Sequence, residues 1–336
     1  MIRKIPFLIL LLMTASPALS QAAPNYANDP NLLWEHYQWF NEAASVTTCM
    51  VLIPQGDYWI GTTEEEIKRY LKEIGSSDTV CFAFHSAFPR HLVHLESFYI
   101  REHEVSNKEY KTFIDATGHS PPQIETDITA IDLQFAWRNG TYPPGRGAIP
   151  VKGIKKADAE YFCQWRTEAT GILHRLPTEE EWEATYRGKE ERLFPWGHRW
   201  DRPRFVSVQR NYEVGPDPFY SFFHFDDITP EGVQFMLGNV REFTSSFYLP
   251  YPAPPGSLSP SESKALANVR FHVRPGRNSI VLRGAGFDDK LRDGFPAYRR
   301  AAYELYSDYN VGFRYVIPVK DGKPVRVEPV KKNQTQ

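Results

Sequence analysis

Loop-forming residues occupy long stretches of this chain and leave only short segments for helices and strands. Residues 119–150 and 189–232 are rich in such residues, and residues 250–263 form a proline and serine segment expected on the surface. The chain also contains 27 prolines and 21 glycines, and 14% of its residues are aromatic. This mixture favours an irregular backbone whose interior is filled by large rings. A helical bundle is therefore excluded.

The segments between these loops predict short elements. Residues 64–74 have the pattern of a short amphipathic helix, and residues 31–44 predict a helix rich in aromatic rings. Residues 50–61 predict two strands joined by a turn at Gln55 and Gly56. Further strands are expected at residues 92–100, 280–283 and 312–317.

Two helix starts are marked by capping boxes. At Ser106–Glu109 and at Thr178–Glu181 a hydroxyl residue precedes a glutamate by three positions, so that each side chain satisfies a free backbone N–H of the other. The two helices are expected to end near Gly118 and Gly188, because glycine tolerates the left-handed conformation at a helix end.

The first residues have the layout of a secretory signal. Arg3 and Lys4 form a basic start, the apolar run of residues 5–13 follows, and small residues surround a cleavage site after Ser20 or Ala22. The alternative is an uncleaved anchor, but the run is too short to span a bilayer comfortably. We expect a periplasmic or secreted protein with no stable membrane span after signal cleavage.

Charge and domain organisation restrict the function further. The formal net charge is -2, so nothing in the global balance points to nucleic acid as a partner. The sequence shows no internal repeat and no linker between separate cores. The expected organisation is a signal peptide at residues 1–22, a helical extension at 23–48, one domain at 49–318 and a flexible tail at 319–336.

The chain has three cysteines. In an oxidising compartment Cys49 and Cys81 could form a disulfide worth about 3 kcal/mol on the chain-entropy account. The alternative is two buried thiols, and both possibilities stay open. Cys163 shares one face of a predicted helix with residues 159, 162 and 166, which indicates a small core residue rather than a nucleophile.

An ordered set of motifs spans residues 50–317 and resembles the formylglycine-generating, or sulfatase-modifying factor, family. Any one of the motifs alone would be weak, but their common order is specific. The motifs are residues 89–110, Asp158-Ala-x-x-Phe-Cys163-x-Trp165, Leu176-Pro-Thr-Glu-x-Glu-Trp182, Phe194-Pro-Trp-Gly197, residues 232–244, Leu282-Arg-Gly-Ala-Gly286-Phe and Asn310-Val-Gly-Phe-Arg314.

The resemblance implies a C-type-lectin-like variant, which is an α+β domain with little regular secondary structure. Most of the motif residues then have structural roles. Trp182, Trp196 and Phe313 are expected in the core. Arg314 and Glu104 are expected to be buried, paired charges that orient loops.

The residues that perform the family's chemistry are missing. In the catalytic branch two thiolates hold copper(I), because a soft monovalent ion needs soft sulfur ligands. Here Asp289 falls at the first cysteine, Asp293 or Gly294 falls at the second, and Gly286 replaces a serine. We therefore expect no copper and no formylglycine generation by the family's mechanism.

The replacing residues allow two interpretations. Asp288, Asp289 and Asp293, with Tyr298 and Arg299, could line a cleft and act as a general base or as a site for a hard metal ion. Alternatively they form a solvated turn with ordinary ion pairs, each of little energetic value. We favour the second interpretation, because aspartates beside glycine are ordinary turn chemistry.

Calcium is a structural feature that the resemblance also implies. Calcium accepts mixed carbonyl and carboxylate oxygens in irregular loops. The alternative is that the glutamate of the second site only pairs with an arginine. The candidate ligands are Asn211 with Asp226 or Asp227 in a first site, and Gly238, Val240 and Glu242 in a second.

Three functions are compatible with these features. We favour a binding or accessory protein, a pseudoenzyme of the family, that holds a peptide, a small molecule or a partner protein on its loops. The alternative is a copper-independent periplasmic enzyme that oxidises a peptidic or small-molecule substrate, as in the exported branch that matures pyoverdine. Formylglycine generation with replaced ligands is a distant third.

Overall fold

The computed structural model describes residue 47 and residues 49–76, 82–123, 136–201, 227–272 and 279–327. Several predictions fall outside these residues and stay predictions. They concern the signal peptide at 1–22, the helix at 31–44, Cys81 as a disulfide partner of Cys49, and the calcium ligands Asn211 and Asp226.

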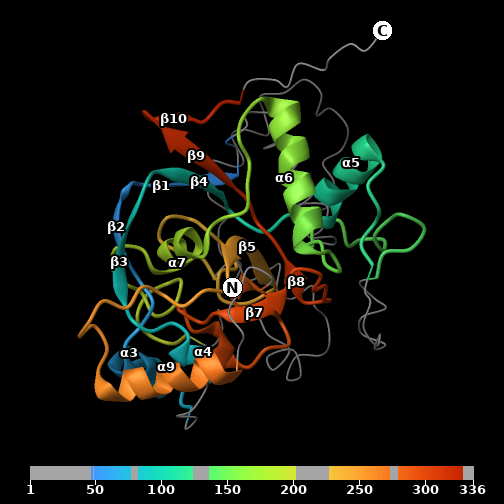
Figure 1. Cartoon of the computed structure of the whole chain (residues 1–336). Coiled ribbons are helices and arrows are strands. Elements are labelled where there is room, and N and C mark those ends of the chain that lie inside the picture. The colour runs from blue at the N-terminus through green and yellow to red at the C-terminus, as the bar shows by residue number, and fades with distance from the viewer. Residues whose placement is uncertain are drawn as a thin grey trace, which may run out of the picture.

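Short helices and short strands alternate along the described chain, which confirms the expected α+β class (Figure 1). Regular structure takes up a modest share of the residues, as the proline and glycine content indicates. The helices are α3 (Glu64–Glu73), α4 (Phe82–His85), α5 (Asn107–Thr117), α6 (Lys156–Thr170), α7 (Glu179–Arg187) and α9 (Pro260–His272), with a 3-10 helix at Leu291–Gly294.

The strands form three small sheets. One sheet has the order β1-β4-β9-β10, a second pairs β2 with β3, and a third has the order β7-β6-β5-β8, in which only β5 and β8 run parallel. The strands are β1 (Met50–Ile53), β2 (Gly56–Ile60), β3 (His91–Leu95), β4 (Phe98–Arg101), β5 (Arg241–Phe247), β6 (Ser279–Arg283), β7 (Arg300–Tyr303), β8 (Val311–Gly312), β9 (Val316–Lys320) and β10 (Lys323–Pro324).

Both predicted capping boxes are confirmed. Ser106 accepts a hydrogen bond from the Glu109 N–H and returns one to the Glu109 carboxylate, and Thr178 and Glu181 do the same in α7. The helices end where glycine was expected: Gly118 caps α5 with φ 71°, and Gly188 caps α7 with φ 59°.

Aromatic rings fill two hydrophobic clusters. One cluster contains Tyr70, Phe84, Trp182 and Phe295. Its helices include α3 and α4, and α4 packs beside α9 in the lower part of Figure 1. The other cluster lies under α5 and α6 at the upper right of Figure 1. Its rings include Tyr110, Phe113, Phe162, Phe243, Phe313 and Tyr315.

The predicted strand at residues 92–100 is in fact two strands. The chain leaves β2 at Leu95 and pairs with β1 and β9 from Phe98 onward. Ser97 stabilises the change of partner, because its hydroxyl accepts a hydrogen bond from the Gln55 N–H at 2.9 Å and its carbonyl accepts one from the Val319 N–H at 2.9 Å.

Two expected loops contain regular structure. The segment 250–263 ends in the first turn of α9, which begins at Pro260. Ser259 and Glu262 form a further capping box at this helix start, each accepting a hydrogen bond from the backbone N–H of the other. Part of the segment 319–336, which was expected to be a flexible tail, is instead regular structure, because it contains the end of β9 and all of β10. β9 and β10 form a hairpin through Asp321 and Gly322, with φ of 51° and 71°.

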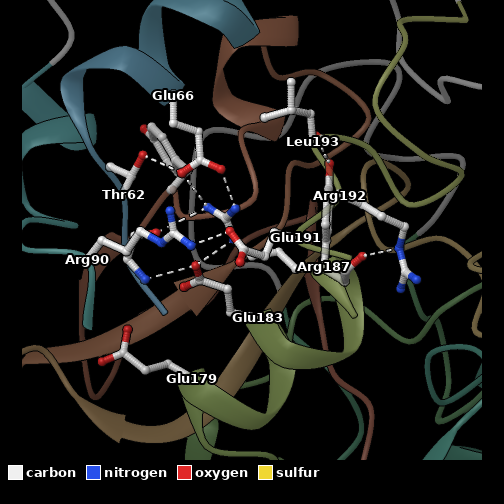
Figure 2. Close-up of polar contacts among 12 residues, drawn as sticks. Thr62, Glu66, Arg90, Glu179, Glu183, Arg187, Glu191, Arg192 and Leu193 are labelled. Carbon is white, nitrogen blue, oxygen red and sulfur yellow. Dashed lines mark hydrogen bonds and ion pairs between the residues drawn. The ribbon is translucent and has the colours of Figure 1, made fainter. Parts of the chain in front are cut away.

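A buried network of charges ties α7 to the two sheets around it (Figure 2). The Glu183 carboxylate is fully buried and accepts hydrogen bonds from Arg187 at 2.8 Å, from the Gly61 N–H at 3.0 Å, and from Arg283. Arg187 in turn donates to Glu66 at 2.6 Å. Because Arg283 ends β6, this network fixes the start of the segment that contains the candidate site.

Within the described residues, none of the helices combines the length and the apolar character that a membrane-spanning helix requires.

Candidate functional site

Residues 284–294 follow β6 and hold Asp288, Asp289 and Asp293, of which Asp289 is predicted from the sequence to stand at the family's first cysteine position. Arg283 anchors this segment by donating a hydrogen bond to the Tyr298 carbonyl at 2.9 Å. The segment then folds back, since the Phe287 N–H donates to the Asn239 carbonyl at 2.8 Å and the Ala285 N–H donates to the Leu237 carbonyl at 3.3 Å. These bonds bring Asp288 and Asp289 close to Arg241, the first residue of β5.

We call Arg241, Asp288, Asp289, Tyr309 and Asn310 the aspartate cluster. Arg241 donates to Asp289 and, at 2.6 Å, to the Asn310 side chain. Asn310 donates to Asp288, which also accepts a hydrogen bond from the Tyr309 hydroxyl at 2.6 Å. The side chains therefore form one chain of hydrogen bonds from a buried arginine to an exposed aspartate.

Asp289 is enclosed in this cluster. Its side chain is only 7% exposed, and its second oxygen accepts a hydrogen bond from the Gly286 N–H at 2.7 Å. Arg300 adds a longer contact at 3.7 Å. Both carboxylate oxygens of Asp289 thus have partners. Burial acts to lower the pKa of Arg241, but the negative charge of Asp289 and its hydrogen bond outweigh burial, so the pKa of Arg241 is raised.

The charges of Asp289 and Arg241 also act on Asp293. Burial first and the neighbouring Asp289 second raise the pKa of the Asp293 carboxyl, and Arg292 at 3.6 Å acts in the opposite direction. Asp288, Asp289 and Asp293 therefore lie in one region, but Asp289 is buried and does not belong to a solvated turn, the interpretation favoured from the sequence.

Gly286 packs closely against Asn310 in the cluster. A Cβ atom at this position would lie 3.0 Å from Asn310 Nδ2 and 3.1 Å from Asn310 Cγ. A larger residue here would therefore need a small shift of Asn310, which links Arg241 to Asp288.

The structure places Arg299 in the interior rather than among the aspartates. Its side chain is 2% exposed and binds both oxygens of Glu179 at 2.7 Å. The Tyr248 and Tyr251 rings lie 4.8 and 4.0 Å from its guanidinium carbon. Tyr298 is partly buried, and its ring packs edge-on against Phe84.

The predicted calcium residues at 238–242 lie beside a buried arginine. Glu242 binds Arg314 through both oxygens, at 2.7 and 2.8 Å, so the pairing considered as the alternative is present. Arg314 is fully buried, and Glu104 lies 4.0 Å from it. The expectation that Arg314 and Glu104 are buried, paired charges is confirmed.

Carboxyl groups outnumber the guanidinium around Arg314. Burial first, together with the nearby Glu242, raises the pKa of Glu104 to about 8 and that of Asp227 to about 7, although Arg314 acts in the opposite direction. One oxygen of Asp227 accepts a hydrogen bond from the Leu237 N–H at 3.1 Å, and the other has no partner in the described part of the chain. Such an orphaned carboxylate oxygen fits a hard cation.

A cation here would have to use backbone carbonyls as well. Among the described residues no three His, Cys, Asp or Glu side chains are arranged to hold a metal ion by themselves. Glu242 can still contribute, because a carboxylate has about four lone-pair sites and Arg314 uses two of them.

Comparison with known proteins identifies the family. The profile of the sulfatase-modifying factor enzyme 1-like domain matches residues 37–319, which is most of the chain. The chain belongs to this family. The motifs that suggested the resemblance lie within the matched range, and the fold of the described residues agrees with it.

Both active and inactive members of the sulfatase-modifying factor family are similar to the chain. The formylglycine-generating enzyme of Bos taurus is 27% identical over 255 residues, which cover 64% of this chain and 62% of that protein. The inactive Cα-formylglycine-generating enzyme 2 of Bos taurus is 32% identical over 238 residues, covering 63% and 75%. The chain thus spans about three-fifths of the formylglycine-generating enzymes that it matches.

A solved structure supports the sulfatase-modifying factor fold. PvdO from Pseudomonas aeruginosa superimposes with a TM-score of 0.57 at 19% identity, over 80% of this chain and 94% of that one. At this identity the likeness concerns the fold alone.

Sequence reasoning missed the arginine at the centre of the aspartate cluster. Arg241 was not among the predicted site residues, because 48 positions separate it from Asp289. Arg241 is the first residue of β5, and the first four residues of this strand are buried. A buried guanidinium requires a carboxylate partner, but only the fold decides which carboxylate it meets.

Proposed function

We propose that this protein is a copper-independent binding or accessory member of the sulfatase-modifying factor family. The observation that carries the proposal is Asp289, the residue at the first copper-ligand position. Its carboxylate is a hard ligand, and both of its oxygens are already bound by Arg241 and Gly286. A thiolate that can bind copper(I) and exchange with a substrate cysteine is replaced by one half of a buried ion pair.

The enzymatic assay of the family tests the negative part of the proposal. The purified mature protein is incubated with a Cys-x-Pro-x-Arg peptide, copper and oxygen, and the peptide mass is followed. We expect no aldehyde and an unchanged peptide mass. A mass loss at the peptide cysteine would sink the proposal, and a catalytically active family member run in parallel shows that the assay works.

An exposed apolar loop supports the binding role. Tyr303 ends β7 and Leu305 follows it, and each is 76% exposed, although both side chains are large and hydrophobic. The same loop continues into Tyr309 and Asn310 of the aspartate cluster. Exposed apolar groups beside an ordered polar cluster are typical of a surface that binds a partner.

Partner capture from the native compartment tests this surface. Wild type and a Tyr303→Ser/Leu305→Ser variant are purified in parallel, and the co-purifying molecules are identified by mass spectrometry. A molecule retained by wild type and lost from the variant supports the proposal. A Leu52→Ser variant is the control, because Leu52 is 48% exposed on β1 in a different sheet. Equal retention by all three proteins would contradict a role for the loop.

We also propose that calcium stabilises the loop before β5. Asp227 and Glu242 would supply carboxylate oxygens, Gly238 and Val240 would supply carbonyls, and the ion would favour the ionised form of the carboxyl groups around Arg314, whose pKa values burial raises. Adding millimolar calcium to the chelated protein should raise the Tm by several degrees at neutral pH, since a ligand that binds only the folded state stabilises it.

An Asp227→Asn variant makes the calcium experiment specific. Asparagine keeps the shape of the side chain and one acceptor for the Leu237 N–H, but it removes the charge. The variant should fold and lose the calcium response. A calcium response of equal size in the variant would place the ion elsewhere, and no response in wild type would refute the proposal.

Export remains part of the proposal and has its own test. The layout of residues 1–22 predicts that the mature protein begins at residue 21 or 23. Cell fractionation tests the predicted export, and the intact mass of the protein from its native cell tests the predicted cleavage site. A mass that includes residue 1 would overturn the predicted cleavage.

A further inference from the structure

A crevice beside α6 is separate from the aspartate cluster and has a volume of about 260 Å³. We call it the α6 crevice. It lies between one face of α6, the segment 173–176 and the middle of β5. The residues that form its walls include Cys163, Thr167, Leu173, His174, Leu176 and Ser245.

The floor of the α6 crevice belongs to the hydrophobic core. Cys163 and Leu176 are 3% and 2% exposed and are members of the cluster under α5 and α6. The expectation that Cys163 is a small core residue is confirmed, but its side chain also borders an open space. A larger apolar residue at position 163 would fill that space.

The two titratable groups on the walls are uncharged at neutral pH. Burial raises the pKa of the Cys163 thiol, and burial together with Arg166 lowers the pKa of His174 to about 4. His174 keeps one ring nitrogen 2.7 Å from the Ile172 carbonyl, which assigns the proton to that nitrogen. The walls therefore offer thiol, aliphatic and neutral imidazole surface.

The charged residues at the rim already have partners. Glu160 binds Lys156 at 2.6 Å, and Arg175 binds both oxygens of Glu181 at 2.6 and 2.7 Å. Gln164 donates to Glu168 at 2.9 Å. A charged ligand would thus meet no available countercharge at this rim, and it would lose hydration on entering an apolar space.

We propose that the α6 crevice is a binding site for a small, uncharged, largely apolar ligand of one or two rings, which lies against the Cys163 side chain. The size agrees with this class, because an apolar cavity of about 150 Å³ is enough for benzene. The polar side chains at the rim are already paired, and this favours a free small molecule over a protein partner. A protein partner would need unpaired polar groups around the apolar centre. This inference is independent of the proposed function.

Ligand-observed NMR on the full chain tests the site with indole as the probe. We expect saturable binding in the millimolar range, as befits a ligand of few atoms. Benzoate, which is of similar size but anionic, should bind at least fivefold more weakly. Absence of saturable indole binding, or equal binding of benzoate, would overturn the proposal.

Substitutions from two opposite walls locate the binding. Cys163→Met and Ser245→Leu each fill the space and should weaken indole binding at least fivefold. Tyr161→Leu is the matched control, because Tyr161 is on α6 and is 55% exposed outside the crevice. If Cys163→Met fails to fold by circular dichroism, Ser245→Leu decides. Unchanged indole affinity in a folded, filled variant would refute the site.

Discussion

Replacing Glu183 by glutamine is expected to lower the free energy of unfolding by about 3–5 kcal/mol. Glu183 is fully buried and forms ion pairs with both Arg187 and Arg283. Figure 2 shows Glu183 beside Arg187. Glutamine has nearly the same shape, so the loss comes from a buried guanidinium without its countercharge. Arg187 retains Glu66, whereas Arg283 has no second carboxylate among its ion pairs in the described residues.

Urea denaturation of the wild type and the Glu183→Gln variant measures this difference. Glu190→Gln is the control, because Glu190 also pairs with a buried arginine, Arg192, but is itself 64% exposed. The control should lose about 1 kcal/mol or less. A loss of that small size in Glu183→Gln would mean that water or another group compensates Arg283.

Replacing Arg241 by methionine is the second large change, and we expect it to destabilise the protein by about 3–5 kcal/mol. Asp289 would remain buried with the Gly286 N–H and the distant Arg300 as its partners. Asn310 would lose the donor that orients its side chain. The aspartate cluster would then loosen at the surface, where Asp288 lies.

A double-mutant cycle separates the ion pair from other effects of the arginine. Asp289→Leu combined with Arg241→Met removes both charges, and the double variant should be less destabilised than the sum of the two single variants. Asp288→Asn is the control, because Asp288 is exposed and should contribute about 1 kcal/mol or less. Simple additivity of the two buried substitutions would contradict a direct coupling.

Stability and function make different demands on this cluster. If the cluster is structural, Asp289→Leu in the background of Arg241→Met should retain the partner captured by wild type. If the aspartates contact the partner, capture should fail even when the double variant is folded. The same proteins therefore test whether Asp289 serves the fold or the ligand.

Local signals in the sequence were sufficient for elements whose stabilisation is local. The capping boxes at Ser106 and Thr178 set the starts of α5 and α7 through bonds within four residues. Two further local signals were present but overlooked. Ser259-Pro-Ser-Glu262 is a capping box with proline at the first helical position, and Asp321-Gly322 is a two-residue hairpin turn.

The sequence by itself determined the family and the α+β class, because ordered motifs and residue types are read directly along the chain. The tertiary structure alone decided the partner of each charge. Arg241 meets Asp289 across 48 residues, and Arg299 meets Glu179 across 120, so Arg299 is interior and Asp289 is enclosed. Buried charges bind whichever opposite charge the fold brings within reach, and that choice has no local signature in the sequence.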